Sequence, residues 1–112
     1  MCALGGAYHR QGDFQEAIEC HKLSLSIVKE LGNRAWEALA CFNLGIVYNS
    51  LRNFEQAIEY YKQCVSITKE EGDRTQEGEA CQNLGDAYEN QGSFVQAIEY
   101  YKQCVKIGRA HV

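Results

Sequence analysis

The sequence predicts an all-α protein, an alpha-alpha superhelix of stacked antiparallel helical hairpins, and two observations carry this prediction. The ten residues Gln56–Val65 recur without a change at Gln96–Val105, 40 residues later, and Glu16–Leu25 is a looser copy in the same register. Repetition at a fixed spacing of this length is typical of helical solenoids. Proline is absent from all 112 residues, which permits long unbroken helices.

Composition and charge narrow the possible partners. The net charge of −4 disfavours nucleic acid and anionic membranes on electrostatic grounds. No apolar run approaches the roughly 20 residues of a membrane span, and the first residues lack the basic and apolar regions of a signal peptide. Of the six cysteines, Cys41 and Cys81 are one period apart, and so are Cys64 and Cys104, so we interpret them as packing residues with reduced thiols and expect a cytoplasmic protein.

The first copy begins inside a helix, because residues 1–11 align with 41–51 and 81–91. A turn follows, in which glycine permits a left-handed residue at the helix end and Asp, Asn or Ser caps the next helix. The turn residues are Gly12-Asp13, Arg52-Asn53 and Gly92-Ser93. Because Arg52 replaces glycine, we expect a less favourable turn in the middle copy.

The second helix of each hairpin begins at Phe14, Phe54 or Phe94 and is amphipathic. In the middle copy its apolar face consists of Phe54, Ala57, Ile58, Tyr61, Val65 and Thr68. A second turn at Gly32-Asn33 or Gly72-Asp73 leads into the next hairpin. We therefore expect a single array of about 2.8 repeats over residues 1–112, with a truncated repeat at 1–33 and further repeats at 34–73 and 74–112.

The recurring residues resemble the tetratricopeptide repeat (TPR) family. The match comprises Leu44-Gly45, Tyr48, Phe54, Ala57, Tyr61 and Cys64, repeated 40 residues later, whereas the first copy has His21 in place of the second tyrosine. The period of 40 exceeds the usual 34 or so. It resembles the subgroup of Pins-type G-protein-signalling modulators, kinesin light chains and large tandem-TPR scaffold proteins. The resemblance implies a scaffold that binds extended peptides, with no catalytic role and no cofactor.

The same resemblance places a peptide-binding groove on the concave side, along the first helix of each hairpin. The implied groove residues are Leu39, Phe42, Asn43, Ile46, Asn49 and Ser50, then Glu79, Gln82, Asn83, Asp86, Glu89 and Asn90, and in the truncated copy Cys2, Ala3, Gly6, His9 and Arg10. Helical spacing supports the assignment, because Gln82, Asp86 and Glu89 share a face that the packing residues do not use.

Asparagine and acidic residues suggest what the groove binds. An amide offers a donor and an acceptor, so Asn43 and Asn83 can pair with a peptide backbone; alternatively they bridge neighbouring helices. Residues 76–91 contain four acidic residues and no basic one, which argues against a carboxylate clamp. We expect a groove with an apolar middle and an acidic end, and a ligand with Lys or Arg beside an apolar anchor. The alternative is that these carboxylates only solvate a surface.

Two further expectations concern metals and the ends of the array. Cys20 and His21 are adjacent on a helix and point about 100° apart, so we expect no metal site there. Neither end resembles a polar capping helix, and we expect a piece of a longer array. The alternative is a structural spacer that self-associates end to end through these uncapped termini and binds no peptide.

Overall fold

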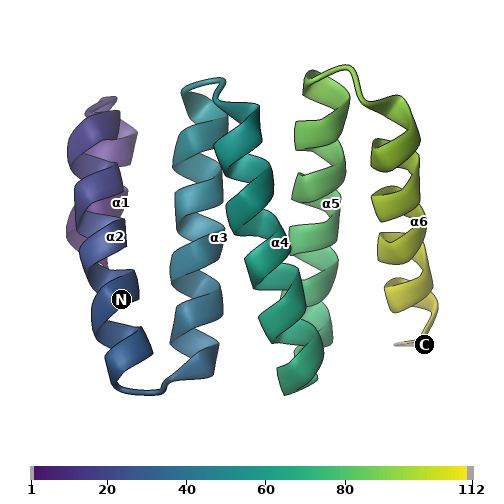
Figure 1. Cartoon of the computed structure of the whole chain (residues 1–112), viewed down its shortest axis with the longest axis horizontal. Helices are drawn as coiled ribbons and strands as arrows, with labels where there is room; N and C mark the ends of the chain where they lie inside the picture. The colour runs from purple at the N-terminus through teal and green to yellow at the C-terminus, as the bar shows by residue number, and fades with distance from the viewer. Residues whose placement is uncertain (1, 111–112) are drawn as a thin grey trace.

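The computed structural model describes residues 2–110, and these residues form six α-helices. The helices are α1 (Ala3–Gln11), α2 (Phe14–Glu30), α3 (Arg34–Ser50), α4 (Phe54–Glu71), α5 (Arg74–Asn90) and α6 (Phe94–Ala110). Figure 1 shows them in chain order along the longest axis, from α1 behind α2 at one end to α6 at the other. Each helix packs on its neighbours in the chain, which confirms the predicted all-α superhelix of antiparallel hairpins.

Side-chain caps and left-handed residues separate the helices, largely as the sequence predicts. Asn33, Asn53 and Asp73 each accept a hydrogen bond from the backbone N–H three residues later, at 3.1 to 3.3 Å. Asp13 was expected to do the same but forms no side-chain cap bond. Arg52 adopts a left-handed φ of 61°, a conformation that costs a residue with a Cβ roughly 1–2 kcal/mol. Its guanidinium lies 5.3 Å from the centroid of the Phe54 ring, which offsets part of this cost.

The two helices of a hairpin approach closely because one carries glycine where the other carries tyrosine. A Cβ on Gly45 would lie 2.5 Å from the ring of Tyr61, and a Cβ on Gly85 would lie 2.6 Å from the ring of Tyr101. These distances are shorter than a side chain tolerates, so the aromatic ring rests directly against the backbone of the facing helix. Leu44 and Leu84, one residue before each glycine, are completely buried.

His21 occupies this tyrosine position in the first hairpin, where it faces Gly5. It is buried, and its Nδ1 atom has no hydrogen-bond partner. Burial lowers the pKa of His21, and the nearby His9 lowers it further. The site therefore favours the neutral imidazole over the charged form. Even in the neutral form, Nδ1 remains without a hydrogen-bond partner.

Replacing Arg52 with glycine should relieve the backbone strain. We expect Arg52→Gly to raise the free energy of unfolding by roughly 0.5–1 kcal/mol, after the entropy cost of glycine is subtracted. The measurement is urea unfolding followed by circular dichroism. Gly92→Ala at the equivalent turn, where φ is 86°, is the matched control and should destabilise by about 1 kcal/mol. A loss of stability in Arg52→Gly would mean that the Phe54 contact outweighs the strain.

Protonation of His21 should destabilise the protein in mild acid. Because its folded pKa lies below the unfolded value, the unfolded chain binds more protons, and stability falls as pH drops below about 6.5. We expect His21→Tyr to flatten the dependence of unfolding free energy on pH between about 7 and 5, and to raise stability by about 1 kcal/mol at neutral pH. His9→Gln serves as the control for the neighbouring histidine; equal flattening in both variants would contradict the assignment to His21.

Candidate functional site

A hollow of about 310 Å³ lies where α3 and α5 face each other across α4. Its lining residues are Ile46, Asn49, Ser50, Tyr61, Asn83 and Asp86. The fold thus brings together five residues that the sequence predicts for the groove, three from α3 and two from α5. Their meeting depends on the stacking of successive hairpins, because α3 and α5 belong to different copies of the repeat.

Tyr61 forms the floor of this hollow. Its side chain is buried, and its ring packs against Phe42 with the centroids 5.9 Å apart. Burial raises the pKa of the Tyr61 hydroxyl, while the side-chain amide of Asn83 acts in the opposite direction. Asn83 therefore interacts with the floor of the hollow as well as facing its interior. This contact gives some support to the alternative in which the asparagine bridges helices.

The acidic end of the site is held by Tyr101. Its hydroxyl donates to a carboxylate oxygen of Asp86 and to Glu89 Oε1, the latter at 2.9 Å. Burial raises the pKa of Tyr101, and the two carboxylates raise it further, so the hydroxyl remains a donor. Asp86 and Glu89 are both exposed, and neither forms an ion pair with another described residue. One neutral hydroxyl thus positions two carboxylates without neutralising their charge.

The remaining predicted residues of α3 and α5 lie outside the hollow. Leu39, Phe42 and Asn43 are half-buried on α3, and Glu79, Gln82 and Asn90 are exposed on α5. Asn49 Oδ1 is buried without a partner, although the residue lines the hollow.

The first hairpin reaches the site through His9. Its Nε2 is hydrogen-bonded to Ser50 Oγ at 2.9 Å, and Ser50 also donates to the carbonyl of Ile46. The sequence predicts both residues for the groove but not this link between α1 and α3.

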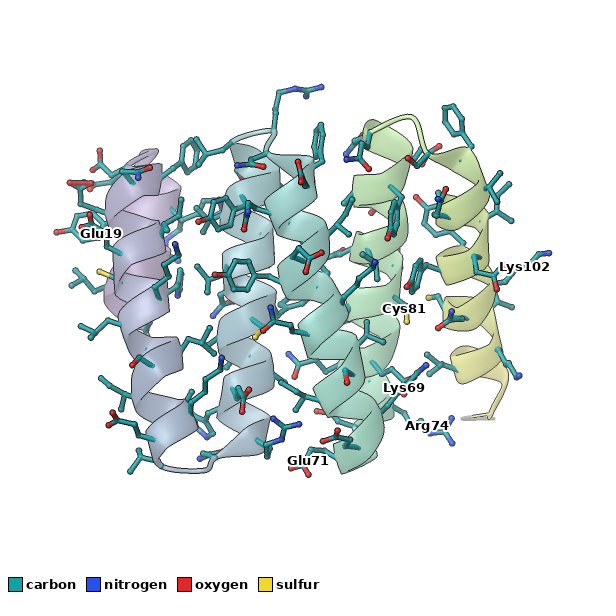
Figure 2. The ribbon with its side chains drawn as sticks, in the orientation of Figure 1. Glu19, Lys69, Glu71, Arg74, Cys81 and Lys102 are labelled. Carbon is teal, nitrogen blue, oxygen red and sulfur yellow. The ribbon has the colours of Figure 1, made fainter. Side chains whose placement is uncertain are left out.

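Glu77 differs from the other acidic residues of α5, because it is buried. It lies in a separate hollow of about 500 Å³ whose lining includes Lys69 and Arg74, labelled in Figure 2, and Lys106. Only three of the four acidic residues on this helix therefore face solvent. The burial of Glu77 could have been predicted from the sequence, because Glu77 and Cys81 are four residues apart and share the packing face.

Sequence comparison identifies the repeat. A tetratricopeptide repeat family model matches residues 1–70 and again residues 43–110, so the two matches together include nearly the whole chain. The chain belongs to the tetratricopeptide repeat family. Domains of the TPR family are generally protein–protein interaction modules rather than enzymes. Comparison with curated protein sequences gave no match.

Solved structures agree with this fold. The TPR domain of Arabidopsis FLU superimposes with a TM-score of 0.87 at 21% identity, over 96% of this chain and 90% of that one. The apo form of RapI gives a TM-score of 0.87 at 20% identity, over 96% of this chain and 39% of that one. The N-terminal domain of C. elegans stress-induced protein-1 gives a TM-score of 0.78 at 18% identity, over 95% of this chain and 80% of that one. At these identities the similarity establishes the fold alone.

Within residues 2–110 no helix is long and apolar enough to cross a membrane. The same residues contain no group of three or more His, Cys, Asp or Glu side chains arranged to hold a metal ion.

The cysteines should divide into two classes by reactivity. Burial raises the pKa of the Cys41 and Cys81 thiols to about 11 and that of Cys64 to about 12, whereas Cys2, Cys20 and Cys104 are only partly buried. Since the thiolate is the reactive form, we expect the three partly buried thiols to react with a maleimide first at mildly alkaline pH. The buried three should react only as fast as the protein unfolds. Mass spectrometry of peptides identifies the modified residues, and early labelling of Cys64 would contradict the packing.

Proposed function

We propose that this TPR array is a scaffold that binds an extended segment of a partner protein along α3 and α5. The segment presents an apolar side chain to the half-buried residues of α3 and a Lys or Arg side chain to α5. The observation that carries this proposal is the hollow lined by Ile46, Asn83 and Asp86, which joins an apolar wall to an exposed carboxylate.

The negative charge of the site determines whether it prefers basic or acidic ligands. Asp86 and Glu89 already accept from Tyr101, and their remaining oxygen lone pairs are available to a ligand cation. A lysine ammonium or an arginine guanidinium donates to carboxylates with charge-assisted hydrogen bonds, which are stronger than neutral ones. A peptide carboxylate placed there would meet two negative charges. Basic segments are therefore favoured over acidic ones.

The asparagines provide contacts that do not depend on ligand sequence. Asn43 and Asn83 occupy equivalent positions on α3 and α5, one repeat apart. Each amide can donate to a peptide carbonyl and accept from a peptide N–H, so an extended backbone can be held while side chains select the sequence. Ala3 stands at the same position on α1 and offers no such contact.

The cellular setting proposed is the cytoplasm. The three buried thiols suit a reducing compartment, because they serve as packing residues rather than as disulfide partners. No catalytic step is proposed, since the groove is open and its carboxylates are exposed rather than enclosed in a dry pocket.

A peptide array tests the electrostatic part of the proposal. The probes are extended peptides with one apolar anchor, carrying Lys, Arg, Gln or Glu at a neighbouring position. We expect the protein to prefer Lys and Arg, and the double variant Asp86→Lys/Glu89→Lys to weaken binding of the best basic peptide by about tenfold or more, as expected for reversing close charges at an interface. Fluorescence anisotropy of that peptide at low and high salt provides the affinities.

The matched control is Glu55→Lys/Glu59→Lys, which changes the net charge by the same amount. Both residues are exposed on α4, the second helix of its hairpin, which lies outside the predicted groove. This variant should retain the preference for basic peptides. Equal losses of peptide affinity in the two double variants would mean that net charge alone causes the effect. An unchanged affinity in Asp86→Lys/Glu89→Lys would contradict the proposed role of the acidic residues.

A further inference from the structure

The outer side of α6 carries an apolar surface that no described residue covers. Ile98 and Val105 are each 53% exposed, and Tyr101 is half-buried between them. With Lys102 and Lys106 they line an open hollow of about 580 Å³, which is larger than the hollow between α3 and α5. We call Ile98, Tyr101 and Val105 the α6 face.

The equivalent residues of the other hairpins are buried. Ile58 and Val65 on α4 are each only 6% exposed, and Tyr61 between them is buried as well, because α5 packs on this side of α4. Ile18, His21 and Leu25 on α2 are likewise buried, with α3 packed on α2. In both cases the covering element is the first helix of a following hairpin. The α6 face is therefore shaped to receive a helix of that type.

The opposite end of the molecule exposes such a helix. Leu4 on α1 is 59% exposed, whereas its equivalents Leu44 and Leu84 are completely buried. Ala7 is also exposed, although Val47 and Ala87 at the same position are buried. Among the described residues, α3 and α5 each have a preceding hairpin packed against them, whereas no described hairpin precedes α1. Leu4 and Ala7 form what we call the α1 face.

We propose that the α6 face of one copy of this chain binds the α1 face of a second copy, so that the stack of hairpins continues from one molecule into the next. The register follows from the interface between α4 and α5, where Lys62 Nζ lies 5.7 Å from the centroid of the Tyr88 ring. Lys102 and Tyr8 are the residues equivalent to Lys62 and Tyr88. In the assembly Lys102 lies over Tyr8 of the second copy.

The side chains at this junction agree with that register. Figure 2 shows Lys102 extending from α6 away from the other helices, toward the space that a second copy would occupy. Where Tyr61 has Asn83 of the next hairpin beside its hydroxyl, Tyr101 would meet Ala3, which offers no hydrogen bond. Its hydroxyl already donates to Asp86 and Glu89 and needs no further partner.

The symmetry of the contact decides how the assembly grows. Each copy uses two different faces, so the interface is heterologous, and every added copy leaves one α1 face and one α6 face free. The assembly therefore lengthens with concentration and does not stop at a dimer. This proposal does not rest on the proposed peptide binding, because its two faces lie on α1 and α6 and most residues of the candidate groove lie on α3 and α5.

Two blocked variants test the pairing of the faces. Leu4→Glu blocks the α1 face, and Val105→Glu blocks the α6 face; both side chains are exposed in the single molecule, so neither change disturbs its core. In sedimentation velocity across a wide concentration range, we expect the wild-type chain to exceed the mass of a dimer. Each variant alone should be monomeric, and an equimolar mixture should form a dimer that does not grow.

Val95→Glu is the matched control, with the same change of charge on the same helix. Val95 is 80% exposed, lies outside the α6 face, and has Glu55 as its equivalent on α4, so this variant should assemble as the wild type does. Circular dichroism verifies the helical content of every variant. A wild-type chain that is monomeric at all concentrations overturns the proposal. So does a dimer of Leu4→Glu alone, which would show that two α6 faces pair with each other.

Discussion

The contact between a glycine on one helix and a tyrosine on the next sets the geometry of each complete hairpin. Any side chain at Gly45 or Gly85 would overlap the facing ring, so these positions fix how closely the helices approach. The same contact carries a large aromatic side chain across the hairpin to the side where α3 and α5 meet. Packing density and the shape of the candidate groove therefore have one cause. The first hairpin keeps the glycine but has His21, which fills the space with an unsatisfied nitrogen.

Repeated residues build the scaffold. Residues that differ between copies change the candidate groove from apolar or neutral on α3 to acidic on α5. The block Gln56–Val65, unchanged at Gln96–Val105, lies entirely on the second helices of the hairpins. On the first helices, Ile46 corresponds to Asp86 and Asn49 to Glu89. One side of the hollow is therefore apolar or neutral and the other acidic, although the backbone positions are the same. A scaffold of this kind can change its ligand through a few substitutions while its core remains intact.

Periodicity predicted the helices, their order and most packing residues, because a 3.6-residue repeat specifies which side of a helix is buried. It could not predict how far a neighbouring side chain reaches. The hydrogen bonds from Tyr101 to Asp86 and Glu89, and the bond between His9 and Ser50, join residues on different helices. Glu77 shows a different limit, since counting charges on one helix does not separate buried acidic residues from exposed ones. Sequence reasoning could name residues that line the hollow, such as Ile46 and Asp86, but not the interactions between side chains.

Tyr101 belongs to two surfaces at once, which has a thermodynamic consequence. Its ring lies on the α6 face, and its hydroxyl holds the two carboxylates of α5. Any ligand that draws Asp86 or Glu89 away from this hydroxyl changes the side chain that a stacked copy must pack against. If peptide binding and stacking both occur as proposed, occupancy of the groove and growth of the stack are linked equilibria, and by reciprocity each alters the other by the same factor. Under these two proposals, Tyr101 is the residue that couples ligand binding to the length of the assembly.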